Sequence, residues 1–357
     1  MVKRIVVGLV IFMIALTGIY LIVTPSPVSP VAYVPPEKPE LSGVLAPNDL
    51  LTAADILGAG LVDGPEDVDV DSEGRVYGGT SDGKILRVLP DGNVELFADT
   101  HGRPLGLHFD AEGNLIVCDS HKGLLSVDKN GQIRCLCDSA EGIQFRFTDD
   151  LDIASNGVIY FTDASDKFSQ ADYLLDLLEA RPHGRLLSYD PKTGQTRVLL
   201  RYLYFANGVA LSEHEDFVLV NETYRYRITR YWLKGPMAGK SDVFIDNLPG
   251  FPDGVSANRR GTFWVALFTV RNDLVDRFHP WVLLKSLMAR TPRAVWPKPE
   301  PYGLVLALDE DGNIIRSLHD PNGRHLKEIT SVEEHEGYLY LGSLHNDRIG
   351  RFALSAD

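Results

Sequence analysis

The strongest constraint on the fold of this chain is a repeated pattern of short strands. In each copy, a small or acidic residue precedes an alternating apolar stretch, and a polar turn with glycine leads into a strand rich in β-branched and aromatic residues. The copies occupy residues 64–80, 106–120, 149–165, 208–223, 254–269 and 329–344. Each is followed by a third strand and usually a fourth. Six such units with little helix between them predict an all-β fold, a six-bladed β-propeller.

The last repeat lacks the strands to complete a blade, because only residues 347–354 follow it as a further strand. We therefore expect the final blade to borrow a strand from residues 54–62, which would close the ring. A β-sandwich is the alternative all-β architecture, but it would not require six similar units.

Two insertions interrupt the repeats and are predicted to form short helices. The first, residues 166–183, contains apolar side chains at helical spacing within 171–180. The second, residues 271–300, is apolar and carries several basic residues. We expect both to cap one end of the propeller. The alternative is that they form a lid or touch a membrane surface, as amphipathic cationic segments can.

The amino terminus predicts a membrane anchor. Lys3 and Arg4 precede residues 5–23, which carry no charge and would span about 28 Å as a helix, close to the thickness of a bilayer core. A cleaved signal peptide is the alternative, but it usually has a shorter apolar part and an A-x-A-like site. We expect a single-pass signal anchor over residues 1–23. The amino terminus would be cytoplasmic and the remainder periplasmic, lumenal or extracellular.

The domain organisation follows from this. Residues 24–40 contain six prolines, which predicts an extended linker that holds the propeller, residues 41–357, away from the bilayer. The formal net charge of −14 argues against a nucleic-acid partner, which would need clustered Lys and Arg. The same charge is compatible with a pocket that collects cations.

Oxygen-donor side chains stand where the first strand of a blade would meet the propeller axis. They occur in four repeats, as Glu66, Asp149 with Asp150, Asn207 and Asp253. Adjacent carboxylates resist burial unless a positive charge compensates them, and hard oxygen donors suit Ca²⁺. The absence of His and Cys there argues against zinc. The sequence thus predicts a calcium site; the alternative is that these are turn-forming residues in loops.

Longer motifs resemble the strictosidine synthase-like family, namely FTDDLDI, FANGVALS, NLPGFPDGV and EEHEGYLYLGS. More distantly, the chain resembles paraoxonases and the gluconolactonase or senescence-marker group. The resemblance implies a six-bladed propeller, a central Ca²⁺ and hydrolysis of esters or lactones. The calcium positions that it implies are Glu66, Asp149, Asn207 and Asp253. Asp149 stands where relatives commonly have Asn.

The chain departs from these families at several positions. Gly254 stands where paraoxonases have a further Asn ligand, and Leu105 where they have the histidine proposed as general base. A histidine-based mechanism therefore does not transfer. Glu334 matches the glutamate with which strictosidine synthase performs a Pictet–Spengler condensation, but relatives share that motif without the activity.

Our main hypothesis is a membrane-anchored, Ca²⁺-dependent arylesterase or lactonase acting on a small ester or lactone. Ca²⁺ would polarise the carbonyl, and Asp253, or next Glu66, would activate water. A non-catalytic binding propeller with a structural ion is the first alternative, and a Pictet–Spengler enzyme using Glu334 is the second. The remaining histidines are expected to be ordinary, without acid partners at a diagnostic spacing; they include His121, His183, His214 and His345.

Overall fold

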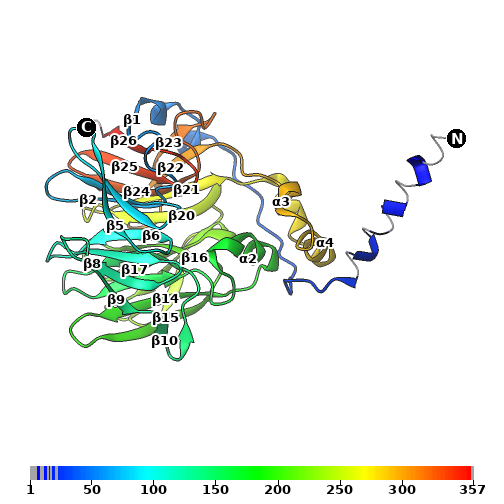
Figure 1. Ribbon diagram of the computed structural model, residues 1–357, viewed down its shortest axis with the longest axis horizontal. Coiled ribbons are helices and arrows are strands. Elements are labelled where there is room, and N and C mark those ends of the chain that lie inside the picture. Colours follow the sequence, from blue (N-terminus) through cyan, green and yellow to red (C-terminus); the bar gives the residue numbers. More distant parts are fainter. Residues whose placement is uncertain (1–5, 9–11, 14–15, 17, 21–22, 355–357) are drawn as a thin grey trace.

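The computed structural model describes residues 6–8, 12–13, 16, 18–20 and 23–354. Its main body is six four-stranded antiparallel sheets (Figure 1). The innermost strand of each sheet contacts that of the next sheet, and the series β2, β6, β12, β16, β20 and β24 returns to β2. The chain is therefore the six-bladed propeller that the repeats predict.

The blades follow one another along the chain. Blade 1 contains β2 (Val68–Val70), β3 (Val76–Gly79), β4 (Lys84–Val88) and β5 (Val94–Asp99). Blade 2 contains β6 (Pro104–Phe109), β7 (Leu115–Asp119), β8 (Gly123–Val127) and β9 (Ile133–Cys137). A small hairpin, β10 (Ser139–Ala140) and β11 (Ile143–Gln144), leads to blade 3. Blade 3 contains β12 (Thr148–Ile153), β13 (Ile159–Asp163), β14 (Gly184–Asp190) and β15 (Gln195–Leu203).

The second half repeats this order. Blade 4 contains β16 (Ala206–Leu211), β17 (Phe217–Glu222), β18 (Arg227–Trp232) and β19 (Ser241–Ile245). Blade 5 contains β20 (Gly250–Ala257), β21 (Thr262–Val270), β22 (Gly303–Asp309) and β23 (Ile314–Asp320). Blade 6 contains β24 (Ile329–His335), β25 (Tyr338–Ser343), β26 (Ile349–Ala353) and, from the start of the chain, β1 (Asp55–Leu57).

Blade 6 closes the ring as predicted. β1 pairs antiparallel with β26, with Asp55 opposite Arg351 and Leu57 opposite Ile349. Strands from the two ends of the domain thus share one sheet, so that opening the ring requires breaking their ladder.

The core lies between neighbouring blades. Phe217 of blade 4 packs against Phe263 of blade 5, and Phe244 lies against both. Near the axis the inner strands approach so closely that only glycine fits: a Cβ on Gly208 would lie 2.5 Å from the carbonyl oxygen of Asp253. A Cβ on Gly254 would likewise lie 2.5 Å from the carbonyl oxygen of Thr330. These glycines let each blade's backbone pass against the next.

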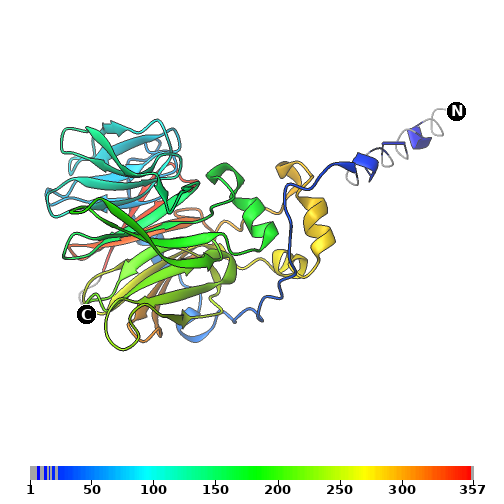
Figure 2. The same cartoon turned by 90° about the horizontal axis from the view of Figure 1, so that it is seen from below.

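Both insertions form helices at one end of the propeller, as predicted. The first gives α2 (Tyr173–Glu179) after a short 3₁₀ turn. The second gives α3 (Asp273–Phe278) and α4 (Val282–Met288), and the side chain of Asn272 caps α3 by accepting from the backbone N–H of Leu274 and Val275. Figure 2 shows these helices projecting from the same side of the blades.

Residues 24–40 are extended, as predicted, but they do not form a free spacer. The Val31 N–H donates to the carbonyl of Glu179 at 3.0 Å, and the Tyr33 N–H donates to that of His279 at 3.1 Å. Arg271 donates to the carbonyl of Pro36 at 2.6 Å. The backbone of this segment is instead hydrogen-bonded to the helical insertions, and its role in holding the propeller away from a bilayer stays a prediction.

The predicted anchor, residues 1–23, lies in part outside the described residues. Among the residues that are described, no helix is long and apolar enough to cross a bilayer. The anchor therefore stays a prediction.

Candidate functional site

The inner strands of the blades are interrupted where they meet the channel. In β12 the pairing steps from Thr148 to Leu151, and in β16 it steps from Ala206 to Val209. β6 and β20 contain equivalent irregularities. The skipped pairs are Leu105–Gly106, Asp149–Asp150, Asn207–Gly208 and, within a broader irregularity, Asp253–Gly254. A bulge frees residues from the ladder and re-aims their side chains, so these positions can face the channel.

The first residue of each skipped pair belongs to what we call the upper ring. With the equivalents from blades 1 and 6, the upper ring comprises Glu66, Leu105, Asp149, Asn207, Asp253 and Thr330. All six line one cavity of about 140 Å³. The four predicted ligands are each buried, with exposed fractions of 3–8%. The structure therefore brings these four together in one cavity.

The walls of this upper cavity are apolar. Aromatic rings from the blades line it, namely Phe147, Phe205, Tyr224, Phe251 and Phe268. Helix α2 contributes Tyr173, Leu174 and Leu177, and α3 contributes Val275. The insertions thus help to line the cavity and present a surface suited to an acyl or aromatic group.

The acidic residues of the upper ring have raised pKa values. Burial, together with the neighbouring carboxylates, raises the pKa of Glu66 and of Asp149 well above the usual range. Burial raises the pKa of Asp253 to about 7, although Nδ2 of Asn207 donates to its Oδ1 at 2.6 Å and opposes that rise. The buried guanidinium of Arg103 offsets part of the negative charge, since it lowers the pKa of Glu66 and of Asp149.

The donor types fit a hard divalent cation. Oδ2 of Asp149 is buried without a hydrogen-bond partner, which is costly for a carboxylate unless a cation compensates it. Three carboxylates and one amide oxygen are the ligands that Ca²⁺ prefers. Within the described part of the chain, however, no three His, Cys, Asp or Glu side chains already form a group that could hold a metal. The carboxylates would therefore have to draw together around an ion.

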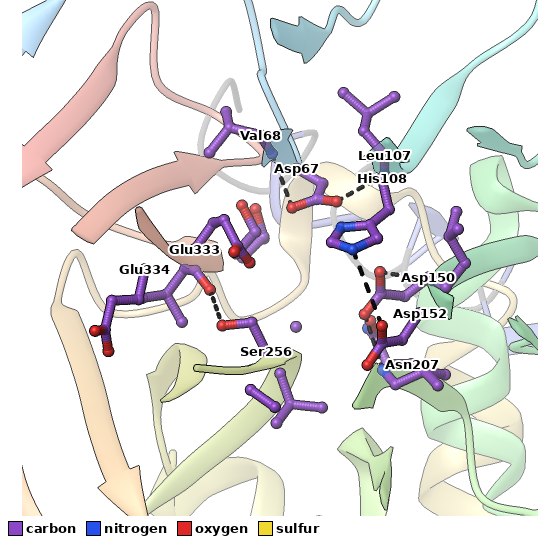
Figure 3. Close-up of a pocket in the computed structure, with 18 of the residues that line it drawn as sticks. Asp67, Val68, Leu107, His108, Asp150, Asp152, Asn207, Ser256, Glu333 and Glu334 are labelled. Carbon is purple, nitrogen blue, oxygen red and sulfur yellow. Dashed lines mark hydrogen bonds and ion pairs between the residues drawn. The ribbon is translucent and has the colours of Figure 1, made fainter. Parts of the chain in front are cut away.

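A second, polar cavity of about 260 Å³, the lower cavity, shares Glu66, Asn207 and Thr330 with the upper one. Figure 3 shows Asp67, Asp150 and Glu333 around it, with His108 between Asp67 and Asp152. Two of its acidic residues, Asp67 and Asp150, directly follow upper-ring residues in the chain. Asp152, Glu333 and Glu334 lie further along the inner strands.

Asp150 therefore differs from Asp149. Its Oδ1 accepts from the Leu151 N–H and its Oδ2 from the Val209 N–H, both at 2.8 Å. Asp67 accepts similarly, from Val68 at 2.8 Å and Leu107 at 2.7 Å. These carboxylates join neighbouring blades through backbone N–H groups. Asp150 is thus explained by hydrogen bonding, and a shared cation is not needed to account for it.

Glu334 does not reach the upper cavity. Its Oε2 accepts from Nε1 of Trp264 at 2.7 Å and from Nδ2 of Asn258 at 3.1 Å, and it pairs with Arg260. It lines the lower cavity, and Figure 3 shows it pointing away from the other labelled carboxylates. This position gives no support to a condensation at Glu334.

Of the four histidines named in the sequence analysis, two have acid partners in the structure. Nδ1 of His345 lies 2.6 Å from Oε2 of Glu328, and its ring meets the edge of Phe268 beside the upper cavity. Nε2 of His183 lies 3.0 Å from Oε1 of Glu179. Glu179 and His183 are only four residues apart, so that pair could have been considered from the sequence, whereas Glu328 and His345 are seventeen residues apart.

Sequence reasoning also missed Arg103 and Thr330. Thr330 could have been found by aligning the sixth repeat with the other five, since it stands at the same position of its blade. Its hydroxyl donates to the carbonyl of Glu66 at 2.5 Å. Arg103 lies before the second repeat and donates to the carbonyl of Gly64 at 3.0 Å; no spacing rule indicates that contact.

Residues 149–236 match the strictosidine synthase family, and residues 43–88 match the strictosidine synthase-like, N-terminal family. The adipocyte plasma membrane-associated protein of Mus musculus is 38% identical over 358 residues, covering 93% of this chain and 85% of that protein. This chain belongs to the strictosidine synthase-like family. A plant member, strictosidine synthase-like protein 6 of Arabidopsis thaliana, is 38% identical over 315 residues, covering 85% of this chain and 82% of its own.

Solved structures with the same fold include a gluconolactonase of Xanthomonas campestris. It has a TM-score of 0.63 at 19% identity and covers 93% of this chain and 99% of its own. A calcium-binding protein, regucalcin, of Agrobacterium tumefaciens has a TM-score of 0.58 at 14% identity and covers 86% of this chain and 94% of its own. At these identities the likeness establishes the propeller fold alone.

Proposed function

We propose that this chain is a membrane-anchored, calcium-dependent hydrolase of esters or lactones. The observation that carries the proposal is the upper ring, in which three buried carboxylates and an amide line one apolar cavity. The gluconolactonase and the calcium-binding regucalcin among the proteins of like fold support it. So does membership of the family, whose relatives include plasma membrane-associated proteins.

Glu66, Asp149, Asn207 and Asp253 would hold the ion. A bound Ca²⁺ supplies a Lewis acid for the substrate carbonyl. Burial and the carboxylates of Asp149 and Asp253 raise the pKa of Glu66, burial and Asp253 raise that of Asp149, and Oδ2 of Asp149 has no hydrogen-bond partner. A bound ion would therefore compensate the negative charge of the buried upper-ring carboxylates.

Asp253 is the preferred general base and Glu66 is the next candidate. Asn207 occupies one oxygen of Asp253, which leaves the other for a water molecule. Burial raises the pKa of Asp253 to about 7 in the ion-free site. A bound Ca²⁺ would lower that pKa and keep the carboxylate ionised, as a general base requires. The aromatic and leucine walls would hold the acyl or aromatic part of the substrate and exclude bulk water.

The anchoring part of the proposal rests on the uncharged residues 5–23. Lys3 and Arg4 would keep the amino terminus in the cytoplasm and put the propeller on the opposite side.

A panel of aryl esters and lactones tests the hydrolase, with the full chain reconstituted in lipid nanodiscs. Asp253→Asn removes the base with little change of volume, and Asp91→Asn, in an exposed turn, is the matched control. We expect turnover in the wild type and in the control, and a loss of at least about 100-fold in Asp253→Asn. Chelation should abolish turnover, and added Ca²⁺ should restore it. Full turnover after exhaustive chelation would overturn the proposal.

A non-catalytic binding propeller with a structural ion is the second candidate. It is favoured by the apolar Leu105 in the upper ring and by carboxylates that are not yet at ligand spacing. It predicts that Ca²⁺ raises the melting temperature while no member of the panel is hydrolysed.

A further inference from the structure

Helix α4 (Val282–Met288) begins with a run of exposed apolar side chains, and the lysine that follows the run is buried. Trp281, Val282, Leu283 and Leu284 are 63%, 41%, 70% and 40% exposed, whereas Lys285 is fully buried. Elsewhere among the described residues after 23, exposed large apolar side chains do not form such a run of four. Single exposed apolar residues are normal, but a contiguous group marks an interaction surface. We call residues 281–284 the α4 face.

The orientation of this face is fixed from beneath. Nζ of Lys285 donates to the carbonyl of Val31 at 2.7 Å, and burial lowers the pKa of Lys285 to about 8. The buried ring of His279 packs edge-on against Tyr33. Rotating α4 would break the contact between Lys285 and Val31, so the first turn, with its exposed apolar residues, is held in this orientation.

The α4 face lies where the apolar amino-terminal segment leaves the domain. Nε of Arg290 donates to the carbonyl of Thr24 at 2.6 Å. Figures 1 and 2 both show the amino-terminal segment extending away from the blades beyond α3 and α4. The described apolar side chains of that segment are themselves exposed, namely Val6, Val7, Phe12, Met13, Leu16, Ile19, Tyr20 and Val23. One apolar medium would cover both surfaces.

We propose that the α4 face lies in the interfacial layer of the same bilayer that holds residues 5–23, as a second membrane contact. The inference rests on the anchoring part of the proposed function. Trp281 and the apolar residues after it suit the interfacial layer, where Trp is favoured. Arg290, Arg293 and Lys298 follow α4 in the chain and could lie at headgroup depth.

This contact also bears on the substrate. Val275 of α3 and the segment Pro297–Lys298–Pro299, on either side of α4 in the chain, line the upper cavity. A bilayer against the α4 face would therefore lie beside the cavity. The substrate class that this arrangement serves is an apolar ester or lactone that partitions into lipid.

Trp281 reports directly on the contact, because Trp264 and Trp296 are buried and Trp232 is half-buried. The full chain is reconstituted in vesicles of phosphatidylcholine with and without brominated acyl chains. We expect bromine to quench the emission, and Trp281→Phe to remove most of the quenchable part. Leu283→Glu should reduce quenching of Trp281, while Leu96→Glu, an exposed leucine on β5, should not. Unquenched Trp281 in vesicle-bound protein would overturn the proposal.

Two further readouts separate this proposal from the proposed function. Flotation with vesicles tests the anchor, and turnover of a short, soluble ester tests the hydrolase. If both succeed while Trp281 is unquenched, only the α4 contact fails. Protection of Trp281 from acrylamide that rises with protein concentration, without bromine quenching, would indicate a second copy of the chain and would also overturn it. We expect Leu283→Glu to raise KM for a long-chain ester in vesicles and leave the short ester unchanged.

Discussion

The upper ring and the lower cavity both bury carboxylates at the propeller hub, yet they use them differently. Both oxygens of Asp150 and of Asp67 accept backbone N–H groups, including one from the neighbouring blade. Asp149, one residue away from Asp150, leaves Oδ2 without a partner. Burial alone therefore does not mark a functional carboxylate. The difference lies in whether the backbone has already satisfied it.

A substitution at Asp253 tests the difference between the two groups of carboxylates most directly. If upper-ring carboxylates serve chemistry, Asp253→Asn should lower kcat/KM by at least about 100-fold and leave the free energy of unfolding unchanged or higher, since it removes a buried charge. Steady-state kinetics and urea denaturation measure both. A large loss of stability with proportionate retention of activity in the folded fraction would place Asp253 with the structural carboxylates instead.

Asp150 should give the opposite result. Asp150→Ala leaves the N–H groups of Leu151 and Val209 without their acceptors, and two unpaired buried donors should cost about 3 kcal/mol of unfolding free energy. Urea denaturation of the calcium-free protein measures it. Asp91→Asn, in an exposed turn, is the control. An unchanged midpoint would show that these bonds do not hold the blades together.

Asp176 on α2 is intermediate between the satisfied Asp150 and the unsatisfied Asp149. It is buried, and its carboxylate accepts a hydrogen bond from the hydroxyl of Ser165 at 2.7 Å. Burial raises its pKa to about 7. The native state thus binds more protons than the unfolded state between about pH 4 and pH 7, so this group's contribution to stability falls as pH rises, by up to about 1.4 kcal/mol per pH unit. Asp176→Asn should flatten that slope in urea titrations at several pH values. A slope equal to the wild type's would contradict the shift.

The smallest effect is expected at Asp149. Asp149→Asn keeps an oxygen donor and removes one charge, so we expect calcium binding to weaken by less than about tenfold and the calcium-free protein to gain about 1 kcal/mol of stability. Calcium titration and thermal unfolding measure these changes. Complete loss of binding would mean that the charge of Asp149, and not only its oxygen, is essential.

Much of this arrangement could be predicted from the repeats. Aligned strands place Glu66, Asn207 and Asp253 at equivalent hub positions, and the incomplete last repeat implies the borrowed β1. The separate roles of Asp149 and Asp150 could not be predicted, because they depend on how the β12 irregularity turns each side chain. The pair of His345 with Glu328, which lies just beyond the paired ends of β25 and β24, leaves no periodic signal either.

The packing of residues 24–40 was also hidden from the sequence. Proline content indicates an extended chain but not what lies beside it, and the hydrogen bonds of Val31 and Tyr33 to the insertions are made through their backbone. The exposure of residues 281–284 is similar, because an apolar run predicts burial and only the structure shows that Lys285 is buried instead.

Calorimetric titration of the metal-free protein with Ca²⁺ tests the central claim most directly. We predict one ion per chain at the upper ring, with binding lost in a Glu66→Gln and Asp253→Asn double variant and retained in Asp91→Asn. Absence of calcium binding, or binding that persists unchanged in the folded double variant, would contradict the account.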